Sequence, residues 1–292
     1  MANVAVPSAS QVAGVTETDA VVTDVGSIKA APLAAVATRV GAEAIARYVG
    51  GHPMAGSERS GPLAASSVLF DGRPWAIAPH ASSSPEAVAL VTALAEACGA
   101  TPFTFTPEEH DEAVARTSHL PHVVAALVAG RLVEAPRQHL ALSGQGVRDV
   151  TRIAAGDPQL WEQILTANTP ALSVLLREVR DELDGVLDAL ESGSRPALNA
   201  ILDRGVTGTS VIPGKHGGPV VAETGVFVVV PDHPGELARL FSDVGEIGVN
   251  VEDVRIDHDP GRPVGLVELT VSAARSEHLL EALAERGWAA HR

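Results

Sequence analysis

The sequence predicts an α/β protein in three parts: a parallel sheet flanked by helices, an all-α helical domain, and a small C-terminal α+β domain. Short apolar runs alternate with helical stretches up to about residue 106, strand signals vanish from 107 to 205, and a strand-helix-strand-strand-helix order closes the chain. The length of 292 residues also exceeds the roughly 150 of one domain. We therefore expect domains at 1–106, 107–205 and 225–292, and a Gly/Pro-rich linker at 206–224.

The first part alternates strands and helices as a doubly wound, Rossmann-like fold does. We expect it to form part of such a sheet. Parallel strands are joined by crossover helices and read as short apolar runs. The expected helices are residues 27–40 and 84–99. The expected strands lie in AVVTDVG (20–26), ARYVGG (46–51), PWAIAP (74–79) and TPFTF (101–105), after an N-terminal NVAV run.

The second part is typical of a helical bundle. Thr106 is placed to cap a helix whose first turn holds a proline and two acids, which is a favourable start. That helix should run to about residue 130 with a kink at Pro121, because proline removes a backbone hydrogen bond. Further helices are expected at 158–166 and 170–191, the second with an apolar stripe.

Composition limits the expected partners. A net charge of −15 disfavours binding to phosphate backbones, so nucleic acid is not expected. The single cysteine, Cys98, excludes an intrachain disulfide and a multi-cysteine metal site, and we expect no metal. Without a basic leader or an apolar run near the ~20 residues that span a bilayer, we expect a cytoplasmic protein that does not contact membranes.

His52 is the first candidate for chemistry. It ends an apolar strand in GGHPMAG, and ligands of open α/β sheets bind at the carboxyl ends of strands. A histidine there can exchange a proton near neutral pH. Ser27, in TDVGSIK, follows the preceding strand and is placed to bond the histidine or a substrate hydroxyl. The structural alternatives are a loop cap for His52 and a helix N-cap for Ser27.

Five motifs together resemble the prephenate/arogenate dehydrogenases of tyrosine biosynthesis, an aromatic amino-acid pathway. They are TDVGSIK, GGHPMAGSERSGP, LFDGRPWAIAP, TSHLPHVVAALVA and LSGQGVRDVTRIAAGDPQLWEQI, and they follow the family's order between about Val4 and Gly205. The later segment VPDHPGELARLFSDVGEIGVNVEDVRI resembles an ACT domain, a small regulatory fold that binds amino acids.

The resemblance implies a reaction and roles for particular residues. The family moves hydride from the hydroxyl-bearing ring carbon of prephenate or arogenate to NAD or NADP, while the ring carboxylate leaves as carbon dioxide. It implies that His52 polarises this hydroxyl with help from Ser27, and that Ser27 and Pro7 lie at the cofactor. The implied substrate-binding residues are Arg152, His119, Asp149 and Trp161, partly across a homodimer interface. Without the motifs, these would be read as polar residues on a solvated bundle face.

The resemblance to an ACT domain implies a regulatory site. Asp232 and Gly235 form a strand-to-helix turn whose free N–H groups could hold an amino-acid carboxylate, and Asn250 opens the next strand. An aromatic amino-acid effector and a dimerising role without any ligand both remain open.

One feature of nicotinamide-binding folds is missing from the sequence. Such folds open with a strand, a G-x-G-x-x-G turn and a helix, whereas the only G-x-G begins at Gly144 in the helical part. We expect the first strands and the phosphate loop to precede Met1, either because the start was assigned too late or because the chain is truncated. We favour the first reason, since half a sheet would expose an apolar edge. The chain as printed should then bind the cofactor weakly and turn over slowly or not at all.

Two rival functions remain. One is a non-catalytic amino-acid-sensing or dimerising protein with a vestigial dehydrogenase part; the intact set of Ser27, His52, His119 and Arg152 argues against it. The other is a different hydroxy-acid dehydrogenase, which would not be expected to carry an HPMAG-type histidine. The sequence does not decide between prephenate and arogenate, or between NAD and NADP.

Overall fold

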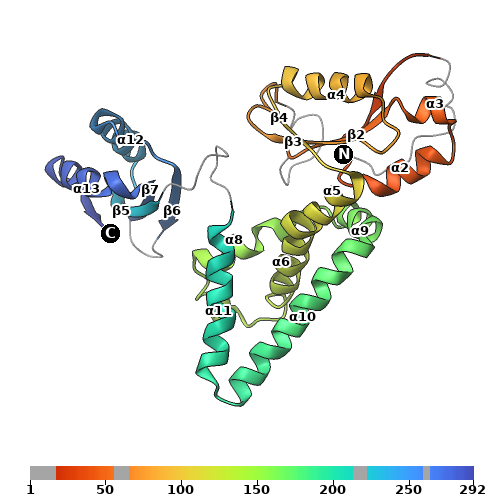
Figure 1. Cartoon of the computed structure of the whole chain (residues 1–292). Helices are drawn as coiled ribbons and strands as arrows, with labels where there is room; N and C mark the ends of the chain where they lie inside the picture. Colours follow the sequence, from red (N-terminus) through yellow and green to blue (C-terminus); the bar gives the residue numbers. More distant parts are fainter. Residues whose placement is uncertain (1–17, 56–65, 213–221, 259–263) are drawn as a thin grey trace. The chain divides into compact units, whose positions relative to one another are not determined.

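The computed structural model describes residues 18–55, 66–212, 222–258 and 264–292 (Figure 1). The chain divides into two compact units, Met1–Asp188 and Ala189–Arg292. Among the described residues, no helix is both long enough and apolar enough to cross a membrane. The first unit contains β1 (Val22–Thr23), α2 (Ala30–Ala37), α3 (Ala42–Ile45), β2 (Tyr48–Pro53), β3 (Pro74–Ala78), α4 (Pro85–Ala97), β4 (Thr101–Thr104), α5 (Pro107–Val114), a π-helical turn (Ala115–His119), α6 (Leu120–Gly130), α7 (Arg137–Leu140), α8 (Gln145–Thr151), a 3₁₀ turn (Arg152–Ala155), α9 (Pro158–Ala167) and most of α10 (Thr169–Glu191).

The sheet of the first unit has the strand order β1-β2-β3-β4. The α/β class is confirmed, and β1–β2 and β3–β4 pair in parallel as expected, but β2 and β3 are antiparallel. An antiparallel pair needs no crossover helix, and described residues 66–73 before β3 form turns. Helix α4 lies against β2, β3 and β4 (Figure 1), and Val49, Ile77 and Val91 are in its buried core.

The cap predicted at Thr106 is confirmed, and the helix expected from residue 84 also begins at a capping residue. The Ser84 side chain accepts a hydrogen bond from the Ala87 N–H of α4 (3.1 Å). Thr106 and Glu109 form a reciprocal capping box at the start of α5, with distances of 3.2 and 2.8 Å. Ser27 does not cap α2, whose N-cap residue is Lys29, so that structural alternative for Ser27 is wrong.

The helix expected from Thr106 to about residue 130 is broken in the middle, as proline predicted. The break is a π-helical turn over Ala115–His119, and Pro121 lies in the first turn of α6. The turn places His119 in the buried region under the helices, where it is 1% exposed. The irregular backbone of the π-helical turn therefore positions His119, one of the candidate site residues, in the protein interior.

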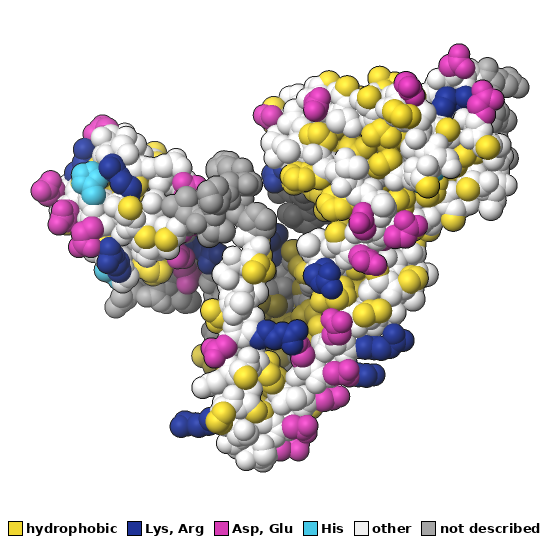
Figure 2. Space-filling model, viewed as in Figure 1, with side chains coloured by type: hydrophobic (Ala, Val, Ile, Leu, Met, Phe, Trp, Pro, Cys, Tyr) yellow, Lys and Arg dark blue, Asp and Glu magenta, His cyan; other side chains and the backbone are white. Residues whose placement is uncertain are grey.

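The apolar stripe predicted on α10 is only partly covered by its own unit. Leu172 and Leu175 are buried, whereas Leu183 and Leu187 are 57% and 49% exposed. Figure 2 shows apolar side chains at the surface of the helical part, beside acidic and basic side chains. This surface is available to another molecule.

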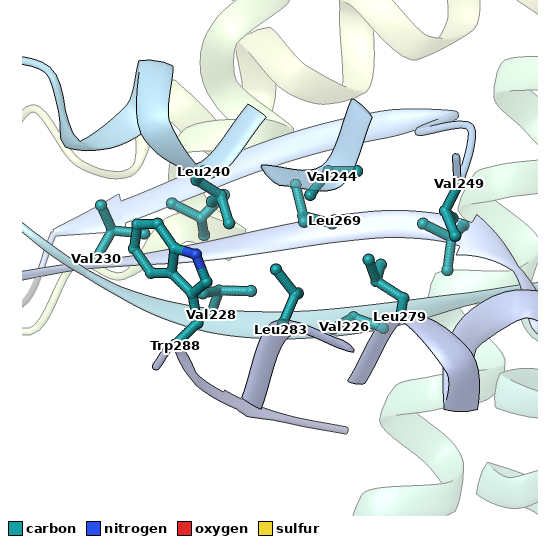
Figure 3. Packing of buried hydrophobic residues seen from close by; sticks show 12 residues of the cluster. Val226, Val228, Val230, Leu240, Val244, Val249, Leu269, Leu279, Leu283 and Trp288 are labelled. Carbon is teal, nitrogen blue, oxygen red and sulfur yellow. The ribbon is translucent and has the colours of Figure 1, made fainter. Parts of the chain in front are cut away.

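The second unit contains α11 (Arg195–Ser210) and a sheet with two helices: β5 (Glu223–Pro231), α12 (Glu236–Ile247), β6 (Asp253–His258), β7 (Val264–Ser272), α13 (Ser276–Glu285) and β8 (Ala289–His291). A linker was expected from residue 206, but α11 continues to Ser210, and the hydroxyl groups of Thr207, Thr209 and Ser210 donate to backbone carbonyls one turn earlier. The strand order β6-β7-β5-β8 is antiparallel throughout, and β8 adds a strand to the predicted βαββα order. This is the split βαβ arrangement. Twelve buried side chains fill the space between strands and helices, among them Val228, Leu240, Leu269, Leu283 and Trp288 (Figure 3).

Candidate active site

The carboxyl end of β2 is built around a buried lysine. The Lys29 side chain is 1% exposed, and its ammonium group forms an ion pair with Asp24 and donates to the Gly51 carbonyl at 2.6 Å. The Tyr48 hydroxyl donates to the other oxygen of Asp24 at 2.7 Å. A Cβ at Gly51 would lie 2.6 Å from the Asp24 carbonyl oxygen, so only glycine fits there. The lysine thereby fixes the peptide that precedes His52.

Burial shifts the pKa of both side chains that contact Asp24. Desolvation lowers the pKa of Lys29 from its usual range, and the neighbouring Asp24 carboxylate partly offsets this. Burial, together with the same carboxylate, raises the pKa of Tyr48 well above its usual range. Tyr48 therefore stays protonated and acts as a hydrogen-bond donor.

His52 belongs to a chain of three side chains. Its Nδ1 lies 2.9 Å from Nε2 of His110, and Nδ1 of His110 lies 2.8 Å from Oδ1 of Asp111. His110 and Asp111 are 1% and 6% exposed. Among the described residues, none forms a hydrogen bond with Nε2 of His52. Sequence reasoning missed His110 and Asp111, although the HD pair lies just one turn into α5, directly after the sheet.

Asp111 also joins α5 to α2. Its Oδ1 accepts from the backbone N–H of Lys29 (2.8 Å), and its Oδ2 accepts from that of Ala30 (2.9 Å). A carboxylate is stabilised at a helix N-terminus, where the backbone N–H groups lack partners. The side chain of Asp111 thus occupies the anion-binding position that this helix N-terminus offers.

The histidines of the site are held neutral. Burial lowers the pKa of His52 to about 3, with smaller contributions from His110, Lys29 and His119. Burial likewise lowers the pKa of His119 to about 4, although the Asp111 charge opposes the shift. Both rings are therefore neutral at physiological pH and can accept a proton.

Acid is expected to destabilise the folded chain through these two histidines. Their folded pKa values, about 3 and about 4, lie below the ordinary 6.5, so the unfolded chain binds more protons in this interval. Their contribution to the free energy of unfolding is complete above pH 6.5 and is lost as pH falls, by about 1.4 kcal/mol per pH unit for each ring. Urea unfolding from about pH 7 to about pH 5 measures this slope, which should be shallower in His52→Asn. An identical slope in both proteins would contradict the prediction.

A second group of predicted residues surrounds Trp161. The His122 ring is stacked on Trp161 with ring centroids 3.6 Å apart, and His119 approaches it edge-on at 6.2 Å. Nδ1 of His119 lies 3.1 Å from Nδ2 of Asn168, which donates to the Asp111 carbonyl at 2.7 Å. Burial lowers the pKa of His122. Asn168 thus links the Trp161 group to the His52 chain.

Gly156 leaves room for the Trp161 ring, which makes it a test of this group. A Cβ there would lie 2.5 Å from the Trp161 indole nitrogen and 2.9 Å from Cδ1. Gly156→Ala should therefore displace Trp161 from His122 and lower the free energy of unfolding by about 1–3 kcal/mol. Urea unfolding and tryptophan fluorescence measure both effects. Gly146→Ala, which meets no atom within 4 Å, is the control, and equal behaviour of the two variants would refute the tight fit.

The structure does not bring the remaining predicted residues into contact with His52. Ser27 is partly buried after β1, and no described residue forms a hydrogen bond with its hydroxyl. Arg152 is exposed in the 3₁₀ turn, and Asp149 is exposed on α8, where it accepts from the Gln145 amide at 2.9 Å. Pro7 and the pair Glu58–Arg59 lie outside the described residues.

The predicted regulatory residues lie in the second unit. Gly235 has a φ of 96° at the start of α12, a left-handed conformation that favours glycine. Asp232 is exposed just before it, and Asn250 donates to the Glu252 carboxylate at 2.7 Å. The turn therefore requires Gly235 for its backbone shape, with or without a ligand.

A cavity of about 560 Å³ lies next to the site. Asp111 and Asn168 line it together with Glu108, Glu112 and Arg116, but His52 and Arg152 do not. The residues that line the cavity thus do not include His52, whose Nε2 has no hydrogen-bond partner among the described residues.

Comparisons with known proteins agree on one family. Residues 3–103 match the family model for the prephenate dehydrogenase nucleotide-binding domain, and residues 106–204 match that for the prephenate dehydrogenase dimerization domain. The probable prephenate dehydrogenase NovF of Streptomyces niveus is 38% identical over 258 residues, which are 85% of this chain and 71% of that protein.

Two solved structures are similar to the chain. The arogenate dehydrogenase of Synechocystis is 29% identical with a TM-score of 0.56, over 65% of this chain and 68% of that one. The prephenate dehydrogenase of A. aeolicus, solved in complex with hydroxyphenyl propionate and NAD+, is 27% identical with a TM-score of 0.58, over 66% of this chain and 68% of that one.

Proposed function

Because the chain belongs to the prephenate dehydrogenase family, we propose that it oxidises and decarboxylates prephenate or arogenate with His52 as the base. The products are 4-hydroxyphenylpyruvate or tyrosine, respectively. The observation that carries the role of His52 is its position at the carboxyl end of β2, with Nδ1 bound to His110 and no described partner on Nε2. The rival interpretation, a non-catalytic sensing protein, is not favoured by relatives that are named as dehydrogenases.

His52 accepts the proton of the substrate hydroxyl at Nε2. A neutral ring is required for this, and burial keeps His52 neutral with a pKa of about 3. That pKa makes it a weak base in the free protein. A substrate that carries two carboxylates would raise it, because a nearby negative charge favours the imidazolium ion. Substrate binding and proton acceptance are thus coupled.

The substrate carboxylates require positive partners. Arg152 is exposed and forms no ion pair with a described residue, so its guanidinium is available for bidentate pairing with a carboxylate. Trp161, with His119 and His122 against it, offers an aromatic surface for the substrate ring. Ser27, between β1 and α2, is proposed to help orient the substrate hydroxyl, and Asp149, one turn before Arg152, to help shape the pocket.

NAD or NADP, the cofactor of this family, supplies the acceptor for the hydride. The N–H groups at the start of α2 donate to Asp111, so this helix N-terminus does not hold the pyrophosphate. What the described residues supply near the reacting atoms is the carboxyl end of β2, which holds His52 in place.

We expect a homodimer formed by the helical part, which matches the dimerization domain model. The apolar side chains left open on α6 and α10 support this, among them Leu127 (64% exposed) and Leu187 (49% exposed). Leu187→Glu should shift the chain toward monomer in light scattering after size-exclusion chromatography. Leu90→Glu, a similar change at an exposed position of α4, should leave the dimer intact. Monomeric wild-type protein would contradict the dimer.

The second unit is proposed as an ACT-like regulatory domain for an aromatic amino acid. Its βαββαβ order and the strand-to-helix turn at Asp232 and Gly235 support this. Calorimetric titration with tyrosine and with phenylalanine tests it, and Asn250→Ala should weaken the binding. No heat with either amino acid would leave dimerisation as the role of this unit.

The proposed function is tested by hydride transfer to NAD and to NADP, with prephenate and with arogenate, at cofactor concentrations high enough for weak binding. Calorimetric titration with hydroxyphenyl propionate provides a second readout that does not need turnover. Turnover of either substrate supports the proposal. The absence of both turnover and binding of the analogue would overturn it.

A further inference from the structure

His110 and Asp111 form a buried pair with no role among the residues assigned so far. Both lie on α5, both are nearly inaccessible to water, and their polar atoms are fully engaged by His52, by each other and by the start of α2. We propose that His110 and Asp111 are positioning residues that hold His52 in the one tautomer with a lone pair on Nε2. This inference rests on the proposed role of His52 as the base.

The hydrogen-bond chain determines each tautomer in turn. An ionised carboxylate only accepts, so Nδ1 of His110 must carry the proton that faces Asp111 at 2.8 Å. In a neutral ring Nε2 of His110 is then an acceptor, and Nδ1 of His52 must donate to it at 2.9 Å. The remaining nitrogen of neutral His52, Nε2, therefore has a free lone pair. Without the pair, either tautomer of His52 could form.

Asp111 is held as a carboxylate that cannot rotate. The backbone N–H groups of Lys29 and Ala30 donate to its two oxygens, at 2.8 and 2.9 Å. Backbone N–H groups never accept, so they exclude an amide nitrogen or a carboxyl O–H from either position. The start of α2 thus sets the donor-to-acceptor direction of the hydrogen bonds from His52 through His110 to Asp111.

The same chain accommodates the proton that the reaction releases. When the substrate O–H bond breaks and Nε2–H forms on His52, the ring becomes an imidazolium ion. Its Nδ1 proton can move to Nε2 of His110, which leaves His52 neutral and places the positive charge on His110 beside the Asp111 carboxylate. One proton enters the His52–His110–Asp111 hydrogen-bond chain and one positive charge remains in it, so the step is balanced without another reactant. The other charged or titratable groups that face His52 are Lys29 and His119.

The tautomers can be observed directly in the full chain. With ¹⁵N-labelled histidine rings, long-range ¹H–¹⁵N correlation spectra distinguish protonated from unprotonated ring nitrogens, and loss of signals in His52→Asn and His110→Asn assigns the two rings. We expect the proton on Nδ1 in both rings of the wild-type protein near neutral pH. A proton on Nε2 of His52 would overturn the proposal, and this outcome depends on no variant.

Asp111→Asn then tests the cause. Both oxygen positions of Asp111 face backbone N–H groups, so an amide cannot take the place of the carboxylate, and His110 loses its fixed acceptor. His52 should then also populate the tautomer with the proton on Nε2, and kcat should fall by about 10²–10⁴-fold with little change in KM. Glu112→Gln removes the same charge one residue later and should change neither the spectra nor kcat. Unchanged tautomers in Asp111→Asn would overturn the proposal. If the wild-type chain neither turns over a substrate nor binds hydroxyphenyl propionate, the proposed function fails, while the spectra still decide the tautomer.

Discussion

Replacing His52 by asparagine is expected to lower kcat by about 10²–10⁴-fold, the usual contribution of a general base. Asparagine can keep the hydrogen bond to Nε2 of His110, because its amide N–H₂ can occupy the place of the histidine Nδ1–H. It supplies no basic nitrogen at the position of Nε2. The change therefore separates the role of His52 as a base from its role in the fold.

The binding of hydroxyphenyl propionate should persist in this variant, since the proposed carboxylate and ring contacts come from Arg152 and Trp161. Calorimetric titration measures the binding, and steady-state kinetics measures kcat and KM. His278→Asn, at an exposed position of α13, is the control and should retain wild-type kcat. A His52→Asn protein with wild-type kcat would show that another group removes the proton.

Much of the fold follows from local sequence signals. The caps at Ser84 and Thr106, the break before Pro121 and the two helices after Pro158 depend on residues adjacent in the chain, and each was predictable. The direction of β3 was not, because a short apolar strand carries no mark of whether its neighbour is parallel or antiparallel. The continuation of α11 through Thr207 and Ser210 was missed for a related reason: small polar residues look like a linker unless their hydroxyls bond back to the helix.

The candidate site was predictable only where a motif carried it. His52 was found from its position after a strand, and His119 and Trp161 from the resemblance. His110 and Asp111 were missed because their roles arise from contacts across the fold: Asp111 bonds the Lys29 backbone 82 residues earlier, and His110 meets His52 58 residues earlier. A histidine and an aspartate early in a helix, among Glu108, Glu109 and Glu112, read as solvated residues. Only their burial in the folded chain reveals otherwise.

The ion pair beneath His52 is expected to have the largest effect on stability. Asp24→Asn removes the charge that faces the ammonium group of Lys29, whose side chain is only 1% exposed and therefore poorly solvated. An uncompensated buried cation costs about 3–5 kcal/mol, so the free energy of unfolding of the first unit should fall by about that amount. The lysine can escape part of this cost by losing its proton, since burial already lowers its pKa.

The double variant distinguishes an electrostatic cause from a loss of packing. Lys29→Met fills the same space without a charge, so Asp24→Asn should cost far less in that background than in the wild-type protein. Urea unfolding followed by the fluorescence of Trp75, which is 3% exposed in this sheet, measures the four free energies of the cycle. Asp181→Asn breaks the exposed Arg180–Asp181 pair and should change stability little. If Asp24→Asn costs the same with and without Lys29, the charge of the lysine is not what Asp24 compensates, and the Lys29 bond to Gly51 alone must hold the strand end that carries His52.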